Sequence, residues 1–86
     1  MPEISRFFGI VIRMYFDDHP PPHFHAKYGE HEAKIEIETG EVLAGKLPRR
    51  AMALVWDWWE LYRTELTECW KQVRDQRKPD SVPPLE

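Results

Sequence analysis

The hydrophobic pattern of this chain changes its period at Pro48. Between Ile10 and Glu38, apolar residues recur at every second position within several short runs, which is the spacing of strands with one buried face. From Ala51 to Val73 they recur at steps of three and four, which is the spacing of one face of a helix. Because the two patterns follow each other along the chain, we expect an α+β fold in which sheet and helix form separate layers.

The extended half divides into runs separated by short turns. We expect an antiparallel meander of three to four strands, at residues 10–16, 23–28, 33–38 and 41–45. Residues 4–8 are expected to form a short extended lead-in to the first of them. The run at residues 10–16 is the most hydrophobic, so we expect it to lie at the centre of the sheet.

One long C-terminal helix is expected to follow the strands and to pack on one face of the sheet. Proline is favoured in the first turn of a helix, and Pro48 stands at the start of the three-four pattern. Cations cluster near the other end, where they are favourable, and Pro79 follows them, so the helix should end at about Gln76. Residues 1–78 then form a single α+β domain, and residues 79–86 form a Pro-rich C-terminal tail.

Composition narrows the class of protein. Apolar residues make up 42% of the 86-residue chain and charged residues 31%, which is typical of a globular domain. The formal net charge of -3 does not indicate nucleic-acid binding by bulk electrostatics, although a local basic patch such as Arg49 and Arg50 can contact phosphate. Cys69 is the one cysteine, which excludes an internal disulfide. We find no signal peptide and no apolar run of roughly 20 residues, so we expect a cytoplasmic protein without membrane association.

The histidines concentrate in residues 17–25, which read Asp-Asp-His-Pro-Pro-Pro-His-Phe-His. His23 and His25 are two positions apart, so on an extended strand both side chains leave the same face. Imidazole nitrogens with nearby carboxylate oxygens are a common ligand set for zinc, manganese or iron. Asp18, His19, His23 and His25 are therefore candidate ligands of a divalent metal such as zinc.

Two other interpretations of this segment stay open. In one, the prolines form a turn in which Asp and His side chains bond to local backbone groups, and no cofactor binds. In the other, His23 or His25 is a catalytic base oriented by Asp17 or Asp18. Cys69 lies on the apolar helix face, so we expect it to be a core residue rather than a nucleophile.

The helix carries more apolar surface than one small sheet is expected to cover. In projection, Met52, Trp56, Trp59 and Trp70 lie together on one flank. Clustered apolar side chains at a surface are typical of interfaces. We expect this flank to bind a partner, most simply a second copy in a two-fold homodimer, whereas Trp58 belongs to the core.

Several segments together resemble a known family. They are Ile4-Ser5-Arg6-Phe7-Phe8-Gly9-Ile10, Asp18-His19, Pro21-Pro22-His23-Phe24-His25, Thr39-Gly40-Glu41 and Leu47-Pro48-Arg49-Arg50. In this order they are similar to the bacterial domain-of-unknown-function family 4160, over nearly the whole chain. The resemblance implies a small stand-alone protein encoded beside a member of another small family, numbered 2442, in a pair of the toxin-antitoxin type. It implies no catalytic role for any residue.

These features together predict a cytoplasmic protein-interaction module, one component of a toxin-antitoxin-like pair, that binds a small protein encoded by the adjacent gene. The alternative is a metal- or histidine-dependent nuclease or hydrolase that uses the His19, His23 and His25 cluster. The cations nearest to these histidines in the expected sheet are balanced by glutamates, which favours partner binding over catalysis.

Overall fold

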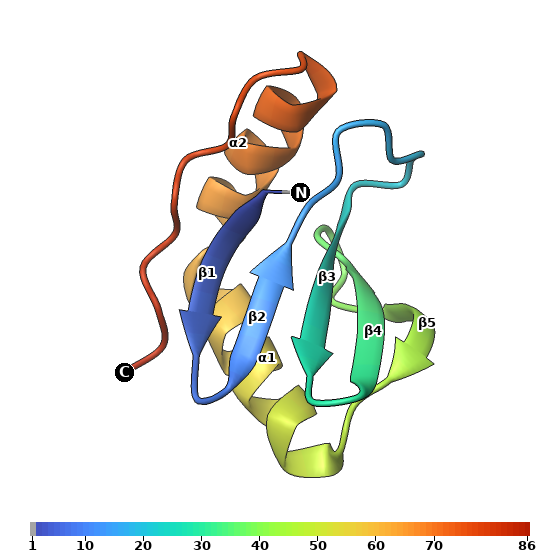
Figure 1. Cartoon of the computed structure of the whole chain (residues 1–86), viewed down its shortest axis with the longest axis vertical. Coiled ribbons are helices and arrows are strands. Elements are labelled where there is room, and N and C mark those ends of the chain that lie inside the picture. The colour runs from blue at the N-terminus through green and yellow to red at the C-terminus, as the bar shows by residue number, and fades with distance from the viewer. Residues whose placement is uncertain (1) are drawn as a thin grey trace.

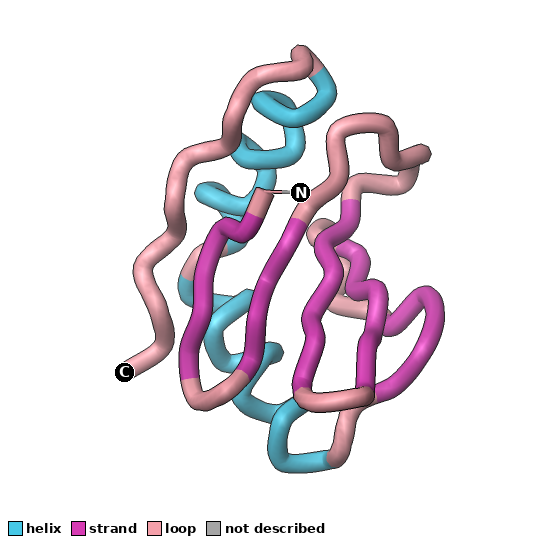
Figure 2. Tube along the Cα trace, in the orientation of Figure 1, coloured by secondary structure: helices cyan, strands magenta, loops and turns pink. Residues whose placement is uncertain are grey.

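Residues 2–86, which the computed structural model describes, form five strands and two helices (Figure 1). The strands are β1 (Glu3–Phe7), β2 (Ile10–Arg13), β3 (His23–Tyr28), β4 (His31–Glu36) and β5 (Val42–Lys46), and the helices are α1 (Arg49–Leu61) and α2 (Arg63–Arg74). Figure 2 shows both helices on one face of the sheet, so the predicted α+β layering is confirmed. Neither helix within the described residues has the length and apolar character needed to cross a bilayer.

The sheet is an antiparallel meander with the strand order β1-β2-β3-β4-β5. The predicted number of three to four strands is too low for residues 2–86, because the lead-in pairs with β2 and forms a strand of its own. In a meander with this order the central strand is β3, so the prediction that residues 10–16 form the central strand is wrong. Strand β2 also ends at Arg13 rather than at the predicted Phe16, because the chain leaves the sheet after Arg13 and forms the loop of residues 14–22.

The helical part of the chain bends at Tyr62 instead of forming the single long helix that the apolar spacing predicts. Tyr62 has φ -123° and ψ 28°, outside the helical range, and its N–H donates to both Trp58 O and Trp59 O. The hydrogen bond from Leu66 N–H to Tyr62 O then starts α2. Sharp bends usually occur at glycine or proline, and neither is present at this position. The sequence therefore gives no local indication of the bend.

The core lies between the sheet and the helices and centres on Trp58. Its ring is fully buried, and the ring centroid lies 5.2 Å from that of Phe7 and 5.7 Å from that of Phe24. The indole N–H donates to Pro83 O, which satisfies the polar atom of the ring. Trp58 therefore contacts both layers and the C-terminal segment.

Residues 79–86 run in an extended conformation beside β1 and the helices (Figure 1). Val82 is buried and its N–H donates to Ile4 O, while Asp80 O accepts a hydrogen bond from Cys69 Sγ. The edge strand of a sheet exposes backbone groups that invite pairing with other chains, and the tail covers part of this edge. The Pro-rich tail is thus packed against its own domain.

Candidate functional site

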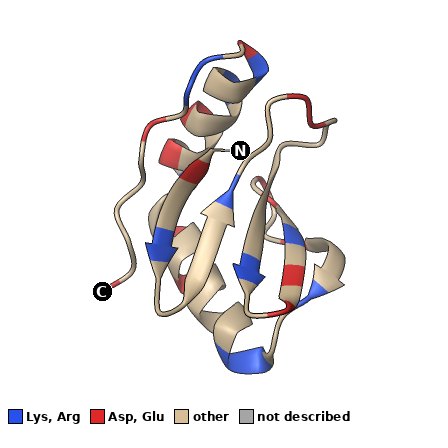
Figure 3. Ribbon diagram, in the orientation of Figure 1, with Lys and Arg blue, Asp and Glu red and all other residues tan. Residues whose placement is uncertain are grey.

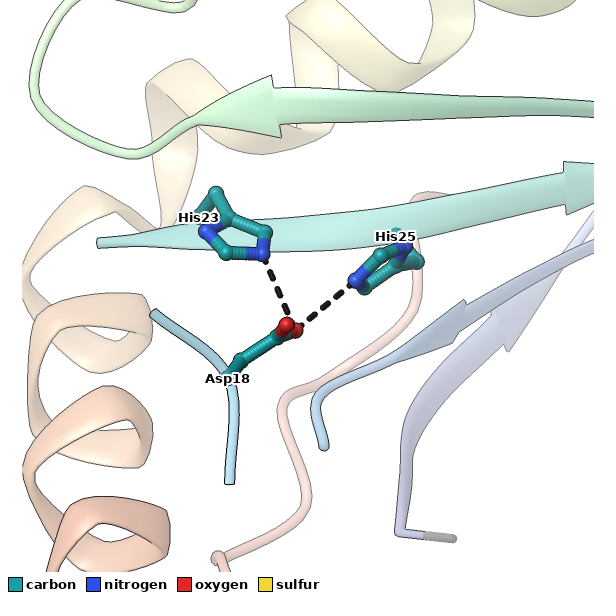
Figure 4. A group of neighbouring side chains, drawn as sticks. All are labelled: Asp18, His23 and His25. Atoms are coloured by element: carbon teal, nitrogen blue, oxygen red, sulfur yellow. Dashed lines mark hydrogen bonds and ion pairs between the residues drawn. The ribbon is translucent and has the colours of Figure 1, made fainter. Parts of the chain in front are cut away.

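Asp18 lies between two histidines at the point where the loop of residues 14–22 meets β3 (Figure 4). Its Oδ2 atom is 2.9 Å from His23 Nε2 and 2.9 Å from His25 Nε2. The two histidines share a face of β3, as their spacing predicts, with ring centroids 5.1 Å apart. Among residues 2–86, these three side chains are the group whose ligand atoms come close enough to hold one metal ion, all within 4.8 Å of one another.

Packing and one hydrogen bond fix the orientation of His23. The side chain is only 1% exposed, and its ring centroid lies 5.2 Å from that of Trp70 on α2. His23 Nδ1 is 2.7 Å from Pro21 O, and because a carbonyl oxygen can only accept, Nδ1 must carry a proton. In a neutral imidazole this leaves Nε2 with a lone pair, and that lone pair faces Asp18.

Weaker contacts orient the His25 ring in a similar way, with Nδ1 next to an oxygen atom and Nε2 next to Asp18. Glu32 on β4 places its Oε2 atom 3.5 Å from His25 Nδ1, which favours a proton on that nitrogen as well. Tyr15 packs edge-on against the imidazole, with the ring centroids 4.4 Å apart. His25 Nε2 is directed at Asp18, and in the tautomer with the proton on Nδ1 its lone pair faces the same carboxylate oxygen as that of His23.

Three facing acceptors are unfavourable unless a proton or a metal ion lies among them. A proton on His25 Nε2, in the other neutral tautomer or in an imidazolium, removes the conflict by donating to Asp18, and a bound metal ion removes it as well. Burial alone would raise the pKa of Asp18, but the contacts with His25 and His23 outweigh burial and hold that pKa below its usual range. Asp18 is therefore a carboxylate near neutral pH and brings a full negative charge to the site.

The contacts around the histidines match those of metal-binding imidazoles. Such histidines usually donate their second ring N–H to a backbone carbonyl or a carboxylate. Here Pro21 O lies next to Nδ1 of His23, and the Glu32 carboxylate lies next to Nδ1 of His25. Zinc lies about 2.0–2.2 Å from nitrogen and oxygen ligands, which places tetrahedral ligand atoms roughly 3.3 Å apart. The distances from Asp18 Oδ2 to the two Nε2 atoms, 2.9 Å each, are shorter than this spacing, and all three ligand atoms lie within 4.8 Å of one another. Small side-chain movements are therefore enough to accommodate an ion.

Solvent reaches the site from two shallow hollows. One, of about 220 Å³, is lined in part by Asp18 and Arg74, and the other, of about 260 Å³, is lined in part by His25 and Lys34. The side chains of Asp18 and His25 are 23% and 17% exposed. A small molecule can therefore approach Asp18 and His25, while His23 stays covered by protein.

His19, the fourth predicted metal ligand, is not part of this cluster. It is exposed and lines the same hollow as Asp17 and Gln76, on the other side of the three prolines that separate it from His23. Asp17 accepts a hydrogen bond of 3.2 Å from the side-chain amide of Gln76, and the carboxylate that contacts both β3 histidines is that of Asp18. Of the four candidate ligands, the structure brings Asp18, His23 and His25 together and places His19 outside their group.

Cations flank the site on the face of the sheet that the helices leave open, and Figure 3 shows basic residues on several neighbouring strands. Arg13 on β2 and Lys34 on β4 are the direct cross-strand neighbours of His25. Within residues 2–86 neither of them forms an ion pair. Arg13 and Lys34 thus place positive charge on both sides of His25, next to the carboxylates of Asp18 and Glu32.

The four residues predicted to bind a partner do not form one exposed patch. Met52 and Trp70 are buried within the chain. Trp56 and Trp59 donate their indole N–H groups to backbone carbonyls of the segment between β4 and β5. Two of the four residues expected on the binding flank, Met52 and Trp70, are therefore covered by the chain itself. Trp56 remains 42% exposed.

A family model described as "Domain of unknown function (DUF4160)" matches residues 9–71 of the chain. The matched region includes strands β2 to β5 and the three residues Asp18, His23 and His25. No curated protein and no solved structure matches the chain.

Proposed function

The chain belongs to the DUF4160 family, and we propose that it binds one divalent metal ion through Asp18, His23 and His25 and uses it in hydrolysis. The observation that supports this proposal is the convergence of Asp18 Oδ2 with the Nε2 atoms of both histidines, while each Nδ1 faces an oxygen acceptor. When both neutral imidazoles carry their proton on Nδ1, the three atoms form a ligand set without a proton donor of its own. A set of two histidines and one carboxylate suits zinc, iron or manganese.

The arrangement is compatible with hydrolytic chemistry. Three protein ligands leave room for water in the coordination sphere, and a bound Zn²⁺ lowers the pKa of such a water to about 7. Arg13 and Lys34 lie beside His25 and favour a substrate with negative charge near the reacting bond. We therefore propose an anionic ester as the substrate class, with phosphodiesters as the first to test.

The metal content of protein purified without an affinity tag tests the binding step. We expect a stoichiometric amount of zinc, iron or manganese in the wild type, or its uptake in a calorimetric titration, and loss of both in Asp18→Ala and His25→Ala. His31→Ala is the matched control, since His31 is exposed at the start of β4 and lies outside the site. A wild type that contains no metal and takes none up in the titration would make the site a structural cluster of hydrogen bonds.

Hydrolysis is tested separately from binding. We expect cleavage of bis-p-nitrophenyl phosphate, or of a labelled RNA oligonucleotide, that stops on chelation and returns when the metal is restored. Asp18→Ala should abolish this activity and His31→Ala should leave it unchanged. Metal binding without any hydrolysis that depends on Asp18 would reject the hydrolase and leave a structural metal site.

A second proposed function is binding of a protein partner, and the exposed apolar side chains favour it. Phe8, Trp56 and Leu61 are exposed although they are large and apolar. We propose a bacterial, cytoplasmic pair of the toxin-antitoxin type, in which the partner is the small protein encoded by the adjacent gene. Self-association through the exposed Trp56 as a homodimer is the simpler form of the same proposal.

Co-expression with the product of the adjacent gene tests the pair. We expect the two proteins to co-purify, and growth to differ between cells that express one protein and cells that express both. Absence of both effects rejects the pair. Light scattering over a wide concentration range tests the homodimer, which is rejected by a monomer mass at every concentration.

A further inference from the structure

The turn between β1 and β2 places an aromatic residue where asparagine or glycine is favoured. Phe8 has φ 48° and Gly9 has φ 79°, so both central residues of this turn have the positive φ of a type I′ turn. Positive φ is unfavourable for a bulky side chain, whereas asparagine tolerates it. Phe8 is also 59% exposed, so burial of its ring offsets little of this strain. The residue is better suited to contact another molecule than to stabilise the turn.

Phe8 forms one wall of an apolar hollow of about 360 Å³. The other walls are Tyr28 at the end of β3 and the residues Pro48, Ala51 and Leu54 at the start of α1. In Figure 1 this region is the lower end of the molecule, where the β1–β2 turn and the start of α1 lie, and the loop of residues 14–22 lies at the upper end. The hollow is therefore separate from Asp18 and has the volume to accept a large apolar side chain.

The rim of the hollow is positively charged. Arg50 lines it, Arg49 precedes Arg50 in the first turn of α1, and no Asp or Glu of residues 2–86 is among its lining residues. Helix α1 also has no acidic residue in its first turn and no side-chain cap. Its first N–H groups are thus available to an acceptor, and the helix dipole favours a negative one.

We propose that this surface, which we call the Phe8 hollow, docks a peptide segment of a protein partner that carries a large apolar side chain next to a carboxylate. Phe8, Tyr28 and Leu54 contact the apolar side chain, and Arg50 with the start of α1 binds the carboxylate. Charge complementarity selects an acidic partner over a basic one. The inference deepens the second proposed function, partner binding, and is independent of the metal site.

Selection of short random peptides displayed on phage tests the proposal. The wild type is the target, and Phe8→Asn is used for counter-selection. We expect the selected peptides to share an aromatic or aliphatic residue next to Asp or Glu. A synthetic peptide of that consensus should bind Phe8→Asn at least roughly tenfold more weakly than the wild type in fluorescence anisotropy.

The unfolding temperature of Phe8→Asn and the salt dependence of binding distinguish a loss of binding from a loss of folding. Asparagine is favoured at the Phe8 position, so Phe8→Asn should unfold at the same temperature as the wild type or at a higher one. Arg50→Gln should weaken peptide binding and reduce its salt dependence, while Lys78→Gln, at an exposed position just before the tail, should do neither.

The proposal is overturned if selection yields no peptide, if the peptides lack the acidic-apolar pattern, or if they bind Phe8→Asn as well as the wild type. Self-association of the wild type that Phe8→Asn abolishes would assign the hollow to a second copy and also overturn it. If the peptide binds through the Phe8 hollow but the adjacent gene product does not bind, the pair is rejected and the docking surface stands.

Discussion

Trp70 of α2 packs against His23 of β3, with the two ring centroids 5.2 Å apart. Arg74, one turn later on α2, places its guanidinium 5.9 Å from the centroid of Trp70 on the same helix. The orientation of one proposed metal ligand therefore depends on how the helical layer packs against the sheet. Changes in α2 should affect the site even though no residue of α2 is a proposed ligand.

Substitution of Trp70 should loosen His23 and weaken metal binding. Trp70 is buried, so Trp70→Leu leaves a cavity, and we expect a loss of roughly 1–3 kcal/mol in the free energy of unfolding. Metal affinity should fall by about tenfold or more, as for other residues that orient metal-binding histidines. Urea denaturation measures the first effect and isothermal titration the second. Unchanged metal affinity in a folded Trp70→Leu protein would show that Pro21 O alone orients His23.

Glu32→Gln should weaken metal binding without unfolding the protein. The Glu32 carboxylate lies near His25 Nδ1 and favours the tautomer that leaves Nε2 free, and glutamine keeps its size but removes the charge. We expect an affinity loss of about tenfold. Glu30→Gln, in the exposed turn between β3 and β4, is the matched control and should bind metal like the wild type. Equal losses in both variants would indicate a general effect of charge.

Trp58→Ala and Trp56→Ala should differ strongly in stability. Trp58 is fully buried, so its removal should cost roughly 3–5 kcal/mol of unfolding free energy and leave the domain largely unfolded. Trp56 is partly exposed and donates one hydrogen bond to Gly40 O, so its removal should cost about 1 kcal/mol. Thermal unfolding followed by circular dichroism measures both. A similar loss in the two variants would contradict the position of Trp58 at the centre of the core.

Cys69 should react slowly with thiol reagents in the folded protein. Burial raises the pKa of the Cys69 thiol from 9.0 to about 11, and the nearby Asp80 carboxylate acts in the same direction. The folded state therefore keeps the proton at pH values where the unfolded state loses it. Stability linked to this group is complete below pH 9 and is lost as the pH rises toward 11.

The reaction with Ellman's reagent at pH 8 should be slow in buffer and rapid in concentrated urea, because unfolding restores an accessible thiol of ordinary pKa. Cys69→Ala should show a shallower decline of stability between pH 9 and pH 10.5 than the wild type. Rapid labelling of the native protein would show that α2 opens readily at this position.

The two layers could be predicted from the sequence because apolar periodicity depends on which face of each element is buried. The bend at Tyr62 could not, since it arises from packing and no glycine or proline marks it. The hydrogen bond of Trp59 could not be predicted either, because its indole N–H donates to Ile37 O, which is far away in the sequence.

The proposed site could be predicted in part because its ligands are close together in the sequence. Asp18, His23 and His25 lie within one short segment, and the alternation of a strand puts the two histidines on one face. Glu32 reaches His25 through the pairing of β3 with β4, and Trp70 reaches His23 through helix packing. Neither contact can be read from local spacing.

The hydrogen bond from Val82 N–H to Ile4 O joins segments far apart in the sequence, whereas each strand pairs with its neighbour along the chain. Local pairing forms early in folding, and contacts with a large separation form late because they close a long loop. The tail should therefore be among the last parts to dock and the first to detach. Each detachment exposes the outer edge of β1 for a short time, so amide hydrogen exchange at Val82 should be faster than in the centre of β3.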